Sequence, residues 1–391
     1  MKALRFCLGV LLLLAPEILR VYFIMPFPGS QEDVATGTRQ INIAYWLHNN
    51  IWWVRLIGLA LVLGPLVYYL RNGGWWKRIG AILPVALCAL VFYAFNFKFM
   101  ADKMFYPPEA KVMTSSPGPF SQGEGESLVI EVERNGDARA YPIELIGYHH
   151  QVLDTIGGEP VLVTYCTVCR TGRAWKPIVR GQPETFRLVG MDHFNAMFED
   201  SLTKSWWRQA TGECIAGPLK GDLLDEVPSQ QSTLKEFAAR YPKGLVFQPD
   251  NHFTEEYAGL KDYDEGTMVS SLEGRDTASW QPKSWVVGVV HNGQARAYDW
   301  NDAVERIVIG DTLGGDTIEV LMFEGNQSFG VYKRWWHRDQ FNEFVGQPSR
   351  PIPKDSAMAS HIDSLTVPAF QEFWHSWRTF HPNTTRYTPK K

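Results

Sequence analysis

Two cysteines three residues apart, Cys166 and Cys169, are the residues of this chain best suited to chemistry. They stand in the segment TYCTVCRTG, where an apolar β-run ends and a turn begins, and such strand ends support site residues rigidly. The pair is a redox dithiol activated by a nearby cation, Arg170 or Arg173, part of a metal site, or a structural disulfide. Covalent haem attachment is excluded because it requires His where this chain has Arg170.

Two histidines near this motif sharpen the interpretations. His150 lies in the element before the strand, and His193 stands in the segment GMDHFN beside a methionine and an aspartate. In the redox interpretation, His150 acts as proton relay or activator and Arg170 favours the thiolate. In the metal interpretation, the two thiols and the two imidazoles form a soft ligand set that suits copper or zinc. A hydrogen-bonded structural role stays open for each histidine.

Other residues near the motif have open roles. Cys214 is the third cysteine outside the apolar N-terminal segments, and it resolves a mixed disulfide, joins a metal site, or is a small buried residue. Trp206 and Trp207 either line a surface that stacks a planar ligand or pack into the core.

The region that holds the thiols contains an internal duplication. The segment NGDARAY at 135–141 recurs as NGQARAY at 292–298, and DTIGG at 154–158 recurs as DTLGG at 311–315, an offset of 157. The 31 aligned positions from 135 to 165 contain 11 identities without a gap. A fixed offset of this kind indicates repeated structural units.

Each copy predicts the same order of elements. A β-run meets an Asn-Gly turn and a second β-run follows, which is typical of a hairpin. An amphipathic stretch, a Gly-Gly turn and another strand come next, and a helical segment closes each copy. The predicted fold is α+β, with a mostly antiparallel soluble region of two tandem repeats. Residues 101–249 form the first repeat, 250–283 a polar connector, and 284–391 a second, degenerate repeat.

The duplication serves as an internal control for function. The hairpin, the Gly-Gly turn and the tyrosines Tyr141 and Tyr298 occur in both copies, so we interpret them as scaffold. The candidate site residues Cys166, Cys169 and His150 occur only in the first copy. The second copy has Phe323, Asn326 and Ile307 at the positions of Cys166, Cys169 and His150.

The first 100 residues predict a membrane region of about three transmembrane helices. The apolar stretches 4–25, 51–70 and 79–97 each approach the roughly 20 residues that a bilayer span needs. The first stretch is either a signal peptide or a retained span, and the absence of a small-x-small cleavage site favours retention. Glu17 and Arg20 lie three residues apart and can pair on one helix face.

Charge and aromatic residues orient this region. The loop 71–78 has three cations and no acid, which predicts a cytoplasmic loop, an N-terminus inside, and a soluble region outside the cytoplasmic (inner) membrane. Many aromatic residues lie near the predicted span ends, as in an interfacial belt: Trp46, Trp52, Trp53, Tyr68, Tyr69, Trp75 and Trp76. The net charge of −4 excludes a strongly basic nucleic-acid-binding surface. The expected partners are therefore the membrane and a redox partner protein, with no nucleic acid.

Three blocks carry a resemblance to a known family. They are YPIELIGYHHQVLDTIGGEPVLVTYCTVCRTGRAW, LVGMDHFNAMFEDSLTKSWWRQATGECIAGPLKG and FWHSWRTFHPNTTRY. The chain resembles the uncharacterised family catalogued as domain of unknown function 3179 over most of residues 125–390. The family is bacterial and archaeal and largely extracytoplasmic, and selenocysteine at the two-cysteine motif of some members implies redox work at Cys166 or Cys169. Cys214, His193 and the three-span region depart from the common pattern of the family.

Overall fold

The computed structural model of this chain describes all residues except 28, 32–33, 116–126, 335–363 and 390–391. The chain folds into two compact units. We call the first the helical unit; it consists of Met1–Tyr106, Phe186–Arg208 and Cys214–Asp222. We call the second the β unit; it consists of Pro107–Thr185, Gln209–Glu213 and Leu223–Lys391.

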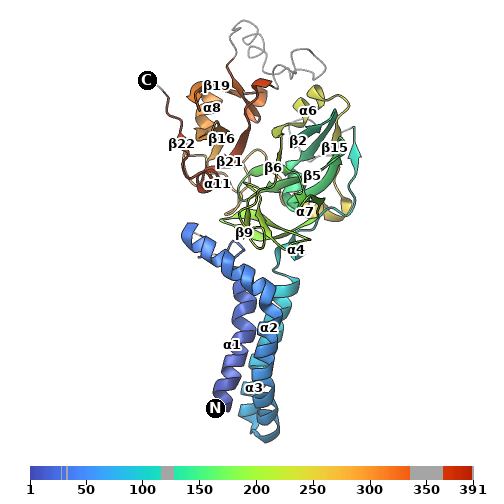
Figure 1. Cartoon of the computed structure of the whole chain (residues 1–391), viewed down its shortest axis with the longest axis vertical. Helices are drawn as coiled ribbons and strands as arrows, with labels where there is room; N and C mark the ends of the chain where they lie inside the picture. Colours follow the sequence, from blue (N-terminus) through green and yellow to red (C-terminus); the bar gives the residue numbers. More distant parts are fainter. Residues whose placement is uncertain (28, 32–33, 116–126, 335–363, 390–391) are drawn as a thin grey trace. The chain divides into compact units, whose positions relative to one another are not determined.

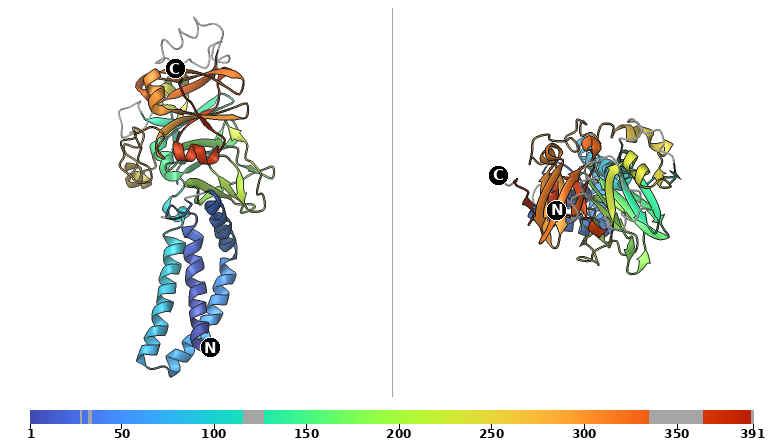
Figure 2. Two further views of the ribbon diagram at one scale, coloured as in Figure 1. Left: turned by 90° about the vertical axis from the view of Figure 1, so that its left-hand side faces the viewer. Right: turned by 90° about the horizontal axis from the view of Figure 1, so that it is seen from above.

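Three long helices form the first part of the helical unit. They are α1 (Lys2–Tyr22), α2 (Val34–Asn72) and α3 (Trp75–Phe97), followed by the short α4 (Ala101–Met104). The three long helices lie side by side (Figures 1 and 2). Among the described residues, two helices are long and apolar enough to cross a membrane, Gly37–Asn72 and Trp75–Phe97. Most of the predicted span 4–25 lies in α1, which has a higher density of charged residues than α2 and α3: its 21 residues include Lys2, Arg5, Glu17 and Arg20.

A buried ionic network joins the three helices. The Glu17 carboxylate on α1 lies 3.0 Å from Arg20 on the same helix, as predicted, and 2.5 Å from Arg55 on α2. Asn96 on α3 donates to Glu17 (3.1 Å) and accepts from Arg20 (2.5 Å) and Arg55 (2.8 Å). Charged groups in an apolar bundle are tolerated when they are paired in this way. The network therefore makes α1 an integral part of the bundle.

The helical unit also contains an antiparallel sheet. Its strands, in the order β12-β11-β10-β9, are Cys214–Ala216, Trp206–Arg208, Asn195–Asp200 and Phe186–Asp192. Ile41 and Ala44 of α2 share one apolar core with Trp206 and Met197 of this sheet. At 1.5 Å per residue the 39 residues of α2 extend over about 58 Å, and its N-terminal part, which contains Ile41 and Ala44, packs on the sheet.

The described residues of the β unit form four sheets of three or more strands. The first has the order β1 (Met113–Thr114), β15 (Leu245–Phe247), β3 (Asp137–Pro142), β2 (Leu128–Arg134) and β14 (Ser229–Thr233). The second has the order β13 (Glu226–Val227), β6 (Thr171–Trp175), β5 (Glu159–Cys166) and β4 (Gln151–Ile156). The third has the order β21 (Ala369–Phe373), β16 (Trp285–His291), β17 (Gln294–Asp299) and β22 (Thr385–Arg386). The fourth has the order β18 (Val308–Leu313), β19 (Asp316–Met322) and β20 (Phe329–Lys333).

The described part of the β unit also contains short helices and a small two-stranded ribbon. The ribbon pairs β7 (Ile178–Val179) with β8 (Gln182–Pro183). The helices are α5 (Ile143–His149), α6 (Leu234–Arg240), η1 (Asn251–Phe253), α7 (Thr254–Ala258), α8 (Trp300–Arg306), η2 (Glu324–Asn326) and α11 (Trp374–Phe380). Most strand pairs are antiparallel, as predicted; β15 with β3 and β17 with β22 are parallel.

The prediction that the soluble region is two tandem repeats is wrong as a description of the whole fold. Its described strands form five sheets, each of three to five strands. The number of sheets is that of the blades in a five-bladed propeller. One of the five, β9–β12, matches no described sheet of the second copy and belongs to the helical unit, because its apolar face is buried against α2. The duplication holds locally: β2–β3–α5–β4–β5 corresponds to β16–β17–α8–β18–β19.

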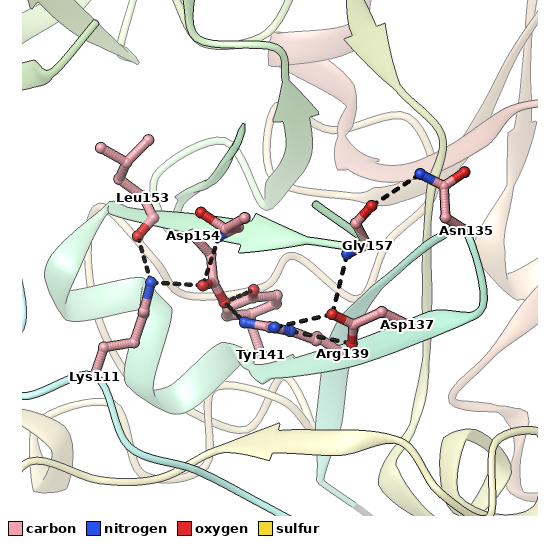
Figure 3. A network of polar contacts seen from close by, with 9 residues as sticks. Lys111, Asn135, Asp137, Arg139, Tyr141, Leu153, Asp154 and Gly157 are labelled. Atoms are coloured by element: carbon pink, nitrogen blue, oxygen red, sulfur yellow. Dashed lines mark hydrogen bonds and ion pairs between the residues drawn. The ribbon is translucent and has the colours of Figure 1, made fainter. Parts of the chain in front are cut away.

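The duplicated residues form one polar network in each copy. In the first copy, Arg139 and Tyr141 donate to the buried carboxylate of Asp154 at 2.7 and 2.6 Å, and Asn135 donates to the Gly157 carbonyl at 2.9 Å (Figure 3). Lys111 adds an ion pair to Asp154 at 2.5 Å (Figure 3).

The second copy repeats these contacts with its own residues. Arg296 and Tyr298 donate to Asp311, and Asn292 donates to the Gly314 carbonyl at 3.0 Å. Each network ties the Asn-Gly turn and the second hairpin strand to the Asp-Thr-x-Gly-Gly turn. These shared residues are therefore scaffold, as predicted.

Candidate functional site

The two cysteines lie where β5 meets β6. Cys166 is the last residue of β5 and pairs in register with Thr171, the first residue of β6. Cys169 lies in the intervening turn, and Arg170 closes the turn with a positive φ of 54°. Both thiols are fully buried. The strand brings them there because its run VLVTYC is buried throughout.

The two thiols contact each other through a side-chain hydrogen bond. Burial raises the pKa of the Cys169 thiol well above its usual value, and the Cys166 thiol raises it further. A hydrogen bond with the Ser376 hydroxyl and the positive charge of Lys283 act in the opposite direction. With the turn buried, Cys169 is therefore a protonated thiol that already has two groups able to stabilise its thiolate.

Residues of the second copy hold the thiol turn in place. The Phe373 backbone N–H on β21 donates to the Cys169 carbonyl at 3.0 Å. Ser376 on α11 lies 3.4 Å from the Thr171 hydroxyl, which itself donates to the Cys169 carbonyl at 3.2 Å. Ser376 also donates to Glu372 at 2.9 Å. The site is thus assembled from both copies, although only the first copy has the thiols.

The connector supplies the remaining contacts to the turn. Tyr263 donates its hydroxyl to the Thr167 carbonyl at 2.8 Å. Lys283 donates to the Val168 carbonyl at 2.6 Å and also to the Leu272 carbonyl. The segment predicted as a polar connector therefore packs on the thiol turn and carries the cation that acts on it.

Arg170 does not have the environment that the redox interpretation expects. Its guanidinium donates to Gln371 (2.9 Å) and to the carbonyls of Tyr263 (3.0 Å) and Asp264 (2.9 Å). It also stacks 3.9 Å from the ring centroid of Trp285. Arg170 therefore fastens the connector and the second copy to the turn, while Lys283 acts electrostatically on Cys169.

His150 ends helix α5 in a left-handed conformation, with a φ of 61°. Its equivalent Ile307 ends α8 with a φ of 63°, so this backbone geometry belongs to the scaffold of both copies. The His150 ring contacts the Tyr148 carbonyl at 3.0 Å, and burial lowers its pKa to about 4. His150 is therefore a neutral imidazole at pH 7, and its role as a proton relay stays a prediction.

The four predicted metal ligands are divided between the two units. Cys166, Cys169 and His150 belong to the β unit, whereas His193 belongs to the β9–β10 hairpin of the helical unit. There His193 pairs with the Asp192 carboxylate, which also pairs with Arg208. Within the described part of the chain, no group of three or more His, Cys, Asp or Glu side chains could hold a metal ion.

Cys214 and the two tryptophans also lie in the helical unit. The Cys214 thiol donates to the Ala216 carbonyl at 3.5 Å, and burial raises its pKa to about 11. Trp206 and Trp207 donate their indole N–H groups to Glu199 and Asp200, both at 2.9 Å. All three are buried. Of the roles left open by the sequence, these environments fit a small buried residue for Cys214 and core packing for Trp206 and Trp207.

Sequence reasoning missed Lys283, Ser376 and Tyr263. Lys283 and Ser376 lie 115 and 205 residues from the turn residues that they contact. No motif or spacing relates them to the thiols. Only their positions relative to the predicted elements could be read from the sequence. Tyr263 and Lys283 lie in the connector, and Ser376 lies in the helical segment predicted to close the second copy.

The comparisons with known proteins identify a family but not an activity. The model of the family described as "Protein of unknown function (DUF3179)" matches residues 112–384, which include the thiol turn, Lys283 and Ser376. No curated protein and no solved structure matches the chain. Because the family match covers well over half of the 391 residues, the chain belongs to the DUF3179 family.

Proposed function

We propose that this protein is a membrane-anchored thiol redox protein in which Cys166 and Cys169 cycle between dithiol and disulfide. The observation that carries the proposal is the contact between the two thiols in one turn, where Lys283 and Ser376 from distant segments interact with Cys169 and bond to Val168 and Thr171 beside it. A cation and a hydroxyl donor are the groups that stabilise a thiolate.

The proposed reaction is thiol–disulfide exchange with a disulfide of a partner protein. A thiolate of the pair attacks one partner sulfur, the partner S–S bond breaks, and a mixed disulfide forms while a partner thiolate leaves and takes up a proton. The second thiol then loses its proton and attacks the mixed disulfide, which releases the second partner thiolate. Two electrons and two protons pass to the partner, and the Cys166–Cys169 disulfide is the oxidised product.

The proposed location is the outer side of the cytoplasmic membrane. The apolar lengths of α2 and α3 support anchoring in a membrane. The cations of the segment 71–78 support a cytoplasmic α2–α3 loop, which directs the thiol region outward. An extracytoplasmic compartment is one in which disulfides form and persist.

A second candidate function, a structural disulfide in a scaffold domain, is favoured by the complete burial of both thiols. Buried cysteines are commonly inert. The two functions differ in whether the native protein exchanges the bond reversibly, and one experiment separates them. For the metal alternative, the divided placement of the four ligands offers no support.

The test is a redox titration of the full-length protein in detergent. The protein is equilibrated in buffers of reduced and oxidised glutathione, quenched with a maleimide, and mapped by mass spectrometry. We expect a reversible two-electron transition at Cys166 and Cys169 in native protein, with Cys214 unmodified in both states. Cys214→Ser serves as the control and should leave the transition unchanged. A bond that becomes reducible only when the protein unfolds would establish the structural disulfide instead.

A further inference from the structure

We propose that one end of the helical bundle, formed by the start of α1 and the α2–α3 junction, binds the headgroups of anionic phospholipids. We call this surface the basic end. Its cations are Lys2, Arg5, Arg71, Lys77 and Arg78, and all five are exposed. The inference rests on the membrane placement in the proposed function and is independent of the chemistry of the thiols.

The basic end has no acidic residue that balances its charge. Residues 1–16 and 56–101 contain no Asp or Glu. Among the described residues, none of the five cations forms an ion pair with a carboxylate. Lys77 and Arg78 lie in the first turn of α3, where the positive end of the helix macrodipole adds to their charge. A surface with one sign of charge attracts ligands of the opposite sign.

Helix packing brings the cations of α1 to those of the segment 71–78. The Lys2 ammonium lies 3.3 Å from the ring centroid of Tyr68 on α2, and Arg5 donates to the Ala60 carbonyl of α2 at 3.4 Å. Figures 1 and 2 show the start of α1 beside the α2–α3 junction. The three long helices share an apolar core here, which includes Phe6, Val62 and Ala81. The fold therefore turns a segment with three cations into a surface with five.

The basic end lies at the level of lipid headgroups in the proposed membrane placement. The apolar spans 51–70 and 79–97 end on the two sides of the junction, so the residues between them fall at a membrane–water interface. Trp75 and Trp76, which are 72% and 82% exposed, precede Lys77, and tryptophan is enriched at this interface. Anionic lipid headgroups are the ligands of opposite charge that a membrane offers at this level.

This inference goes further than the positive-inside rule. That rule predicts only the side of the membrane on which such cations lie. Headgroup binding also predicts a preference for anionic over zwitterionic lipid. One Lys or Arg near an anionic membrane surface strengthens the association about fivefold. The preference should weaken as salt screens the charges.

The test is electron paramagnetic resonance of spin-labelled lipids. Full-length protein is reconstituted in phosphatidylcholine vesicles that contain spin-labelled phosphatidylglycerol or spin-labelled phosphatidylcholine, and the fraction of each label that the protein restricts in motion is measured. We expect the association constant of phosphatidylglycerol to be about fivefold the larger. The excess should fall when NaCl is raised from about 0.05 M to about 0.5 M.

Two negative outcomes have different meanings. Equal association constants for the two lipids would overturn this inference and leave the membrane placement intact. The absence of restricted lipid of either kind would contradict the membrane placement itself, and this inference with it. The redox titration of the thiols tests the rest of the proposed function separately.

Matched variants assign the preference to the basic end. Arg71→Gln combined with Lys77→Gln should lower the phosphatidylglycerol preference about twofold or more, while the restricted fraction of phosphatidylcholine stays unchanged, as for an intact bundle. Arg71→Lys combined with Lys77→Arg keeps the charge and should keep the preference. The control is Lys98→Gln combined with Lys103→Gln, two exposed lysines just beyond the other end of α3, which should have no effect. An equal loss in this control would overturn the assignment to the basic end.

Discussion

At the scale of single residues, the charged groups around the thiol turn differ in how well they are compensated. Arg170 has three polar partners and an aromatic face. Among the described residues, the nearby Asp264 carboxyl has one hydrogen-bond donor, the Leu128 backbone N–H at 2.9 Å, and its second oxygen is buried without a hydrogen-bond partner. Burial therefore raises its pKa to about 6, although Arg170 and the Leu128 N–H lower it and Glu144 and Glu265 raise it further.

This imbalance predicts a pH-dependent stability. Because the folded-state pKa of Asp264 lies above its ordinary value of 3.8, the folded state loses stability as the pH rises from about 4 through 6. Asp264→Asn keeps an acceptor for Leu128 and should raise the free energy of unfolding at pH 7.5 by up to about 3 kcal/mol, since each pKa unit corresponds to about 1.4 kcal/mol. Thermal unfolding at pH 4.5 and 7.5 measures the effect.

The expected increase in the free energy of unfolding is largest at pH 7.5 and becomes smaller toward pH 4.5. The control is Asp225→Asn at an exposed position, which should change neither value. A variant that is destabilised at both pH values would mean that the Asp264 carboxylate is compensated in the folded state.

At the scale of elements, the connector packs on the thiol turn. Tyr263 and Lys283 donate to the carbonyls of Thr167 and Val168, and Arg170 donates back to the Tyr263 and Asp264 carbonyls. Because both thiols are fully buried, a reagent or partner reaches them only after some of these contacts have opened.

Loosening the connector should therefore speed thiol modification in the native protein. Tyr263→Phe removes the hydrogen bond to Thr167, and a loss of about 1 kcal/mol would raise the population of open turns about fivefold. Alkylation rates of reduced protein, read by mass spectrometry, should rise by that factor. Tyr257→Phe is the matched control, because its buried hydroxyl contacts His149 at 2.7 Å rather than the thiol turn. Equal rates in both variants would mean that the hydrogen bond from Tyr263 to Thr167 is not the barrier.

At the scale of the whole molecule, the N-terminal helices also support a β-sheet. The core shared by Ile41, Ala44, Met197 and Trp206 makes sheet β9–β12 depend on α2. The ionic network of Glu17, Arg20, Arg55 and Asn96 in turn fixes α1 to α2 and α3. The helical unit is thus a bundle and a sheet that share their stability.

A charge placed in this shared core should release the sheet. Ala44→Asp buries an unpaired carboxylate, which costs several kcal/mol, and we expect protease cleavage within residues 186–222 at concentrations that leave the wild type intact. Asn42→Asp adds the same charge to an exposed position of α2 and should have no effect. Cleavage that is equal in both variants would mean that the sheet is stable without α2.

Much of the fold could be predicted because its signals are local. Apolar length identified α2 and α3, and Asn-Gly turns between β-runs identified the antiparallel hairpins. The duplication led to an incorrect architecture because it says nothing of Phe186–Arg208 and Cys214–Asp222, which fold with the helices. Whether these residues pack within a repeat or against α2 depends on which apolar faces contact each other. A repeat in the sequence gives no information about such contacts.

By itself, the sequence determined that two thiols stand at the end of a buried strand, in only one of two copies of a duplicated scaffold. Only the tertiary structure decided which groups surround them. The positive charge that acts on Cys169 comes from Lys283 and not from Arg170. Arg170 has a left-handed backbone, and its guanidinium donates hydrogen bonds to the carbonyls of two connector residues, Tyr263 and Asp264. The tertiary structure also separated His193 from the thiols by unit. Sequence spacing constrains neighbours a few residues apart, whereas the groups that tune a buried thiol arrive from more than 100 residues away.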